Sequence, residues 1–196
     1  KMNQAILERI GQAVSERFGV LFPRERWRKP RNTVRTASTN LGFDSVDEFV
    51  SSLCDDTLSD EEWQHVGDAF TVAVTSFFRE QRAFELLVER VVPQLLQRRP
   101  GPIKVWSAAC CTGEEAYSLA MVLRRNFPEI AAHSFDILAT DVNRGFLAHA
   151  ERAMYNLQAF AACHPWVIRD YCVQLSTSTV AVSPDVRNAV RFDRLN

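Results

Sequence analysis

Apolar residues in the first third of the chain recur every three to four positions, which is the spacing of one face of a helix. Two Ser residues, Ser45 and Ser59, each stand three positions before a Glu, at Glu48 and Glu62. This spacing is typical of a capping box, so each pair predicts the start of a short helix. The apolar face of the first predicted helix, which ends near Gly19, consists of Ile6, Ile10, Ala13, Val14 and Phe18.

From Arg79 onward, helical and extended patterns alternate. A long apolar stripe predicts a helix that is interrupted at Pro93, because proline lacks the backbone N–H and its ring clashes with the preceding turn. The segments that follow are a strand at 103–109, a helix at 114–127, a strand at 133–142 and a helix at 144–155. Alternation of strands and helices predicts a parallel sheet in a Rossmann-like α/β fold.

Short alternating runs near the end of the chain predict further extended structure. They contain Val180, Val182, Val190 and Phe192. The sheet would then have about three strands, fewer than the ~4 to 6 that are usual. We therefore expect a helical domain at 1–72 and a partial sheet domain at 73–196, with the C-terminal part of the sheet missing from this chain.

Composition and charge narrow the function classes only slightly. The net charge of -1 gives no general attraction to nucleic acid or to a membrane, so recognition has to be local. The chain lacks an apolar run of about 20 residues and a secretory signal, which favours a cytoplasmic location. Five cysteines without CxxC spacing predict neither a disulfide framework nor a metal site. The basic run at 24–35 is usually a solvated face and less often docks an acidic partner.

Candidate chemistry lies at residues 107–118, SAACCTGEEAYS, where the first strand turns into a helix. Dinucleotide folds need several glycines at this turn so that a pyrophosphate can sit on the helix N-terminus. Here only Gly113 is present, Ala108 and its small neighbours leave room for a ligand, and Glu114 and Glu115 repel phosphate. Alternatively, the two acids only complement the helix dipole, for about 0.3 to 1 kcal/mol each. If they bind a ligand, it is cationic on that side.

A further acid, Asp141, ends the second strand, 28 residues after Gly113. In such folds a carboxylate at about this place binds ribose hydroxyls. A nucleoside that carries an ammonium group would satisfy both Glu114 and Asp141. S-adenosylmethionine is the common cofactor of that description.

Four segments in this order resemble the CheR family of chemotaxis receptor methyltransferases: TSFFREQRAF, VWSAACCTGEEAYSLA, ILATDV and VRFDRLN. The family shows a T-x-F-F-R-E motif, a loop with T-G-E-E-P-Y-S, and an A-T-D strand end. The similarity spans the chain, including its helical first part. It implies a class I methyltransferase sheet preceded by a small all-α domain, with a small β-subdomain within about 160–191 that in some members grips a receptor peptide.

The resemblance also implies the activity and the site. Family members transfer a methyl group from S-adenosylmethionine to glutamate side chains of chemotaxis receptors, giving methyl esters and S-adenosylhomocysteine. By position, Glu114 holds the methionyl ammonium, Asp141 the ribose, and Asn196 lies near the adenine. Ala108, Thr75 and Arg79 also contact the cofactor, and Arg79 orients the cofactor or the incoming carboxylate. No metal is implied.

Departures from the family pattern keep alternatives open. Ala73 stands where the family has an asparagine, and Ala116 where it has a proline. The family's later segment, with a C-R-N motif and an active-site tyrosine, is absent up to Asn196, so we expect an incomplete fragment. A catalytically silent module that binds S-adenosylmethionine or its product as an adaptor or sensor is the second hypothesis. A dinucleotide-dependent enzyme is the third, and the single glycine disfavours it.

Overall fold

The computed structural model describes residues 4–19, 30–98, 102–128 and 135–196. The chain divides into two compact units: 1–72 together with Asn196, and 73–195. The first half of the basic run at 24–35, residues 24–29, lies outside the described residues. Within the described part, no helix is long and apolar enough to cross a membrane.

Helices account for the regular structure described in the first unit. They are α1 (Gln4–Phe18), α2 (Pro30–Asn40), α3 (Val46–Cys54) and α4 (Asp60–Phe70). Both predicted helix starts are confirmed. Ser59 and Glu62 form a complete capping box, and the Ser45 hydroxyl accepts a hydrogen bond from the Glu48 N–H at 3.1 Å. The centre of this unit is apolar and fully buried at Ile10, Val14, Val34, Phe49, Leu53 and Val66.

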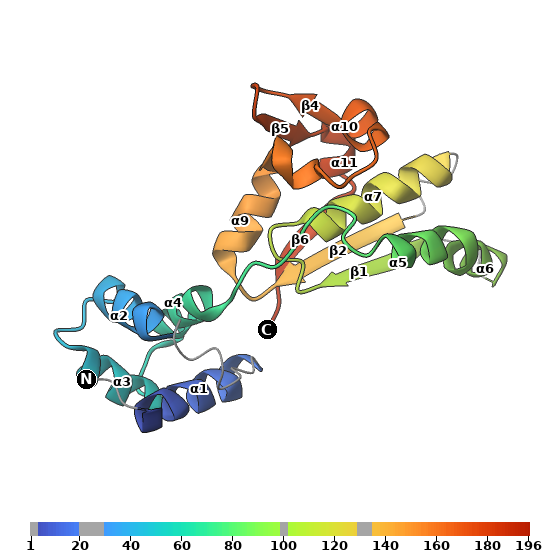
Figure 1. Cartoon of the computed structure of the whole chain (residues 1–196). Helices are drawn as coiled ribbons and strands as arrows, with labels where there is room; N and C mark the ends of the chain where they lie inside the picture. Colours follow the sequence, from blue (N-terminus) through green and yellow to red (C-terminus); the bar gives the residue numbers. More distant parts are fainter. Residues whose placement is uncertain (1–3, 20–29, 99–101, 129–134) are drawn as a thin grey trace. The chain divides into compact units, whose positions relative to one another are not determined.

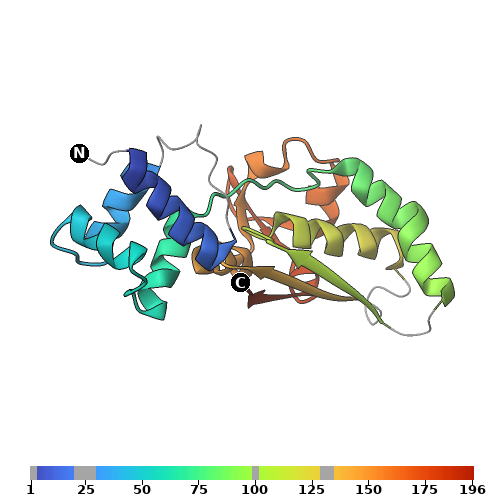
Figure 2. The same ribbon diagram turned by 90° about the horizontal axis from the view of Figure 1, so that it is seen from below.

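A parallel sheet forms the centre of the second unit, in the order β1 (Ile103–Ala108), β2 (Phe135–Asp141) and β6 (Val190–Arg194). Helix α7 (Glu114–Asn126) lies along it (Figures 1 and 2). Ile137 and Ala139 are buried, whereas Trp106 on the opposite face of the sheet is 60% exposed. The predicted parallel α/β arrangement is confirmed.

The interruption predicted at Pro93 is a π-helical turn. Helix α5 (Gln81–Leu86) runs into this turn, η2 (Leu87–Val91), and continues as α6 (Val92–Arg98). In a regular α-helix the proline ring would meet the carbonyl of Glu89, four residues earlier. The wider π turn lies where this conflict arises, so the chain continues as a helix on both sides of it.

The second sheet is antiparallel, in the order β3 (Met154–Asn156), β5 (Thr179–Val182) and β4 (Cys172–Gln174). Short helices precede, separate or follow its strands in the chain: α9 (Arg144–Arg152), η3 (Leu157–Phe160), α10 (Trp166–Tyr171) and α11 (Pro184–Arg187). This sheet begins before the expected range of 160–191.

The helix expected at 144–155 is therefore shorter in the structure. It ends at Ala153, which has a left-handed φ of 53° and whose N–H donates to the carbonyls of Ala150 (3.0 Å) and His149 (3.2 Å). Ala153 is fully buried. Tertiary packing therefore overrides the helical preference of alanine at this position. Met154–Asn156 form a strand instead of continuing the helix.

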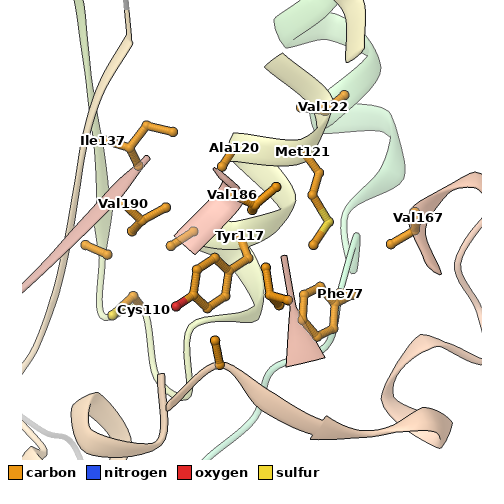
Figure 3. Close-up of a cluster of buried hydrophobic side chains, with 14 of the residues drawn as sticks. Phe77, Cys110, Tyr117, Ala120, Met121, Val122, Ile137, Val167, Val186 and Val190 are labelled. Carbon is orange, nitrogen blue, oxygen red and sulfur yellow. The ribbon is translucent and has the colours of Figure 1, made fainter. Parts of the chain in front are cut away.

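One apolar cluster surrounds α7 and fixes it in the second unit. Figure 3 shows Tyr117, Ala120 and Met121 of α7 in this cluster, together with Phe77. The Phe77 ring stacks on Phe160 with 4.0 Å between ring centroids. The segment that contains the T-x-F-F-R motif is thereby fixed within the second unit.

Candidate functional site

The carboxyl ends of β1 and β2 lie side by side at one edge of the parallel sheet, where Ala108 is paired with Thr140. The Cys110 N–H continues the pairing beyond the strand by donating to the Thr140 carbonyl at 2.9 Å. In open α/β sheets, ligands bind outside this edge. The loop at 109–113, which leads from β1 into α7, is therefore the first element of the candidate site.

This loop has an unusual backbone. Ala109, Cys111 and Gly113 have left-handed φ angles of 55°, 52° and 94°. For a residue other than glycine such a conformation costs about 1–3 kcal/mol, and it persists only where the surroundings impose it. A Cβ at Gly113 would lie 2.8 Å from the Ala150 Cβ, so the loop also packs closely on α9. The loop contains only one glycine because two other residues, Ala109 and Cys111, also adopt left-handed φ angles.

Asp141, at the end of β2, holds this loop in place. Its side chain is 7% exposed. One carboxylate oxygen, Oδ2, accepts the Cys111 N–H at 2.8 Å, and the other, Oδ1, accepts the Asn143 N–H at 2.9 Å. Each oxygen can accept one further hydrogen bond. The carboxylate thus joins the loops after β1 and β2 and keeps acceptor capacity for a hydroxyl group.

Glu114, the first residue of α7, is buried, with 7% of the residue exposed. Its Oε2 atom accepts a hydrogen bond from the Thr112 hydroxyl at 2.7 Å. Among the residues that the structure describes, Glu114 forms no ion pair. A buried carboxylate without a counter-charge is unfavourable, and a bound cation would relieve this cost.

Glu115, the neighbouring acid, has a different environment. It is exposed, and its Oε1 atom accepts a hydrogen bond from the buried Ser107 hydroxyl at 2.6 Å. It therefore ties the start of α7 to β1. The two adjacent acids therefore have different environments. Glu114, the buried one, is the acid that fits a cation in a buried position.

The T-x-F-F-R segment is tied to the same helix. The Phe78 N–H donates to the Ser118 hydroxyl at 3.0 Å, and that hydroxyl donates to the Glu114 carbonyl at 2.6 Å. Arg79, which is exposed, donates from Nη1 to the Val74 carbonyl at 2.9 Å. This bond joins the two ends of the segment at 74–79, which contains Thr75.

The predicted site residues are thus brought together in part. Ala108, Glu114 and Asp141 surround one loop at the edge of the sheet. Thr75 and Arg79 belong to the segment that is bonded to α7. Asn196 is grouped with the first unit, and its role near an adenine stays a prediction.

Sequence reasoning missed three residues that shape the site. They are Thr112, Ser118 and Tyr155. The first two lie inside the motif that was recognised, so their position in it was a usable signal. Tyr155 gave no signal, because the apolar pattern assigned it to a helix.

The two cysteines of the loop are buried free thiols. Burial, with a smaller effect of the Asp141 carboxylate, raises the pKa of the Cys110 thiol to about 12. Burial also raises the pKa of the Cys111 thiol. Because the thiolate is the reactive form, both side chains remain unreactive thiols at neutral pH.

Two cavities of the second unit, of about 380 Å³ and 450 Å³, lie elsewhere. Neither is lined by any of the six predicted site residues. The candidate site is therefore defined by buried charge and by loop geometry at the sheet edge.

Comparison with known proteins identifies the family of this chain. Residues 73–196 match the family described as CheR methyltransferase, SAM binding domain. Chemotaxis protein methyltransferase 2 of Vibrio cholerae is 32% identical over 139 residues, which is 70% of this chain and 48% of the relative. The chemotaxis protein methyltransferase of Listeria innocua is 33% identical over 147 residues, which is 75% of this chain and 53% of the relative. The chemotaxis protein methyltransferase of Salmonella typhimurium is 28% identical over 198 aligned positions, which cover 100% of this chain and 66% of the relative.

The chain therefore spans about half to two thirds of the length of these curated relatives. The family match covers more than half of the chain, including the loop at 109–113, Glu114 and Asp141. The matched domain is described as the one that binds S-adenosylmethionine. The chain belongs to the CheR methyltransferase family.

Proposed function

We propose that this chain binds S-adenosylmethionine outside the carboxyl ends of β1 and β2, with Glu114 holding the methionyl ammonium. The observation that carries the proposal is that Glu114 is a buried residue whose carboxylate forms no ion pair among the described residues. An ammonium group would supply the missing counter-charge through charge-assisted hydrogen bonds.

The other predicted residues complete the proposed site. Asp141 accepts the ribose hydroxyls with the acceptor capacity that its two backbone hydrogen bonds leave. Ala108, at the end of β1, leaves room for the ligand beside the loop. Thr75 and Arg79 contact the cofactor from the segment bonded to α7, and Asn196 lies near the adenine.

The proposed reaction is methylation of glutamate side chains on chemotaxis receptors, which gives glutamate methyl esters and S-adenosylhomocysteine. The relatives' names, chemotaxis protein methyltransferase, support a methyltransferase that acts in chemotaxis. When bound, S-adenosylmethionine supplies the methyl group.

The chain's own residues would mainly bind and orient. A receptor carboxylate, with a pKa near 4.3, is already ionised at neutral pH, so no general base is required. Alignment of the reacting groups can contribute up to roughly 7 to 11 kcal/mol. Arg79 orients the cofactor or the carboxylate and cannot act as a base, because a guanidinium keeps its proton in proteins.

The receptor itself is the proposed partner. Following the family resemblance, the antiparallel sheet of β3, β5 and β4 is the surface proposed to hold a receptor peptide. The basic run at 24–35 is proposed to meet the acidic helices that carry the methylated glutamates.

A transfer assay tests the proposed function. Tritiated S-adenosylmethionine is incubated with receptor-bearing membranes and either the unmodified chain, Glu114→Gln or Glu115→Gln. We expect base-labile label in the receptor with the unmodified chain and with Glu115→Gln, and strongly reduced label with Glu114→Gln. Saturable cofactor binding without any transfer would instead support the silent sensor or adaptor module.

A further inference from the structure

Tyr155, in the middle of β3, reaches from the small antiparallel sheet to the loop at 109–113. Its side chain is 4% exposed. The hydroxyl donates a hydrogen bond to the Thr112 carbonyl at 2.6 Å. It also lies 3.1 Å from the position that a Cβ would take at Gly113. One side chain outside the recognised motif thus bonds to Thr112 and leaves little room for a side chain at Gly113, the two residues that precede Glu114.

Thr112 passes this contact on to the carboxylate. Its backbone carbonyl accepts from Tyr155, and its side-chain hydroxyl donates to Oε2 of Glu114 at 2.7 Å. Because both groups belong to one residue, the hydrogen bond to the carbonyl holds the backbone from which the hydroxyl projects, and the hydroxyl's own hydrogen bond to Glu114 selects its direction. A hydrogen bond to one oxygen of a carboxylate selects among the rotations of that group.

The Tyr155 ring is itself held on several sides. It makes edge-to-face contacts with Phe77 at 4.9 Å and with His149 at 5.3 Å between ring centroids. Tyr117 contacts it at 6.3 Å. Burial raises the pKa of the Tyr155 hydroxyl well above its usual value of about 10, so it stays a donor at neutral pH. The hydroxyl is thus presented to Thr112 at a fixed place.

We infer that Tyr155 is a positioning residue, which acts through Thr112 to orient the Glu114 carboxylate toward the ammonium group of the cofactor. This inference rests on the proposed function and deepens it. It predicts that loss of the Tyr155 hydroxyl weakens ligands that carry the amino-acid tail and spares ligands that carry only the nucleoside.

The test is calorimetric titration of the chain with two ligands. S-adenosylhomocysteine carries the ammonium group, and 5′-methylthioadenosine has the same nucleoside without it. We expect Tyr155→Phe to weaken S-adenosylhomocysteine binding by about 3- to 10-fold, the effect of one hydrogen bond, and to change methylthioadenosine binding by less than about 2-fold. Tyr171→Phe, at a half-buried tyrosine for which the structure shows ring packing, is the matched control and should change neither.

Changes at Thr112 test the relay independently and remain informative if Tyr155→Phe folds poorly. Thr112→Val removes the hydroxyl and should weaken S-adenosylhomocysteine binding to a similar extent, whereas Thr112→Ser keeps the hydroxyl and should restore it. The double variant Tyr155→Phe with Thr112→Val should bind no more weakly than either alone, within about 2-fold, because both remove the same orientation.

Two outcomes would overturn the inference while the proposed function stands: equal weakening of both ligands by Tyr155→Phe, or no weakening of S-adenosylhomocysteine by Tyr155→Phe and Thr112→Val. Absence of saturable binding by the unmodified chain would overturn the proposed function itself, and the inference with it.

Discussion

The carboxylate of Asp141 accepts the backbone N–H of Cys111, in the loop of the neighbouring strand, at 2.8 Å. The same carboxylate accepts the Asn143 N–H at 2.9 Å. The residue proposed to bind ribose therefore also holds two loops in their observed positions. If Asp141 binds the ribose as proposed, ligand binding and loop structure depend on one side chain, and changes there alter both.

The first prediction concerns Asp141→Asn. An amide keeps one oxygen acceptor and replaces the other with a donor, which then faces a backbone N–H. We expect a loss of about 1–3 kcal/mol in the free energy of unfolding and a large loss of S-adenosylhomocysteine affinity. Thermal unfolding and calorimetry measure the two effects.

Asp136→Asn is the matched control for this change. Asp136 lies on the same strand, β2, and is exposed, so the variant should behave as the unmodified chain. If Asp141→Asn left both stability and ligand affinity intact, the double role of Asp141 would be wrong.

The second prediction separates backbone strain from packing at Gly113. Gly113→Ala places a Cβ 2.8 Å from the Ala150 Cβ and 3.3 Å from its Cα, at a φ of 94°. Gly42→Ala has a similar positive φ of 76° but no atom within 4 Å. We expect Gly42→Ala to cost about 1 kcal/mol and Gly113→Ala to cost more than 3 kcal/mol in the free energy of unfolding. Equal losses in the free energy of unfolding, measured with urea, would show that α9 moves to make room for the added methyl group.

The third prediction concerns Ser118, which is fully buried and links the T-x-F-F-R segment to α7. Ser118→Ala leaves the Phe78 N–H without its partner, at a residue whose φ is 52°. We expect a loss of about 1–2 kcal/mol in stability and faster proteolysis within 73–80. Ser51→Ala, at an exposed position of α3, should change stability by less than about 0.5 kcal/mol. Unchanged proteolysis in Ser118→Ala would mean that the Phe77 packing alone holds the segment.

The fourth prediction is a loss of stability in alkali. Burial raises the pKa of Tyr155 and of Tyr117 above the value of 10.0 expected in the unfolded chain. Above about pH 10 the unfolded chain releases protons that the folded chain retains, so the free energy of unfolding falls as the pH rises. Urea unfolding between pH 8 and 11 measures this slope. Tyr155→Phe should make it shallower, and an identical slope in that variant would contradict the assignment.

Much of the fold follows from local patterns in the sequence. The Ser59 capping box, the interruption at Pro93 and the parallel strands around Asp141 were each predicted from residues that lie close together in the chain. The exception is the end of α9. Ala153 takes a left-handed conformation because it is buried, and nothing in its local sequence indicates this.

The site could be predicted to the same extent. Glu114 and Asp141 were recognised because a strand end and a helix start mark them in the sequence. The family resemblance singled out Glu114, but the contact that distinguishes Glu115, its hydrogen bond from Ser107, could not be predicted from the sequence. The position of Tyr155 depends on strand β3, which the sequence did not predict. Its contact with the loop at 109–113 is therefore visible only in the structure.

The most direct test of the account is calorimetric titration of the chain with S-adenosylhomocysteine, in parallel with Glu114→Gln and Glu115→Gln. The account predicts saturable binding by the unmodified chain, equal binding by Glu115→Gln, and at least about 10-fold weaker binding by Glu114→Gln, the loss of a charge-assisted interaction with the ammonium group. Equal binding by all three, or none by the unmodified chain, would contradict the assignment of Glu114 as the group that holds the cofactor.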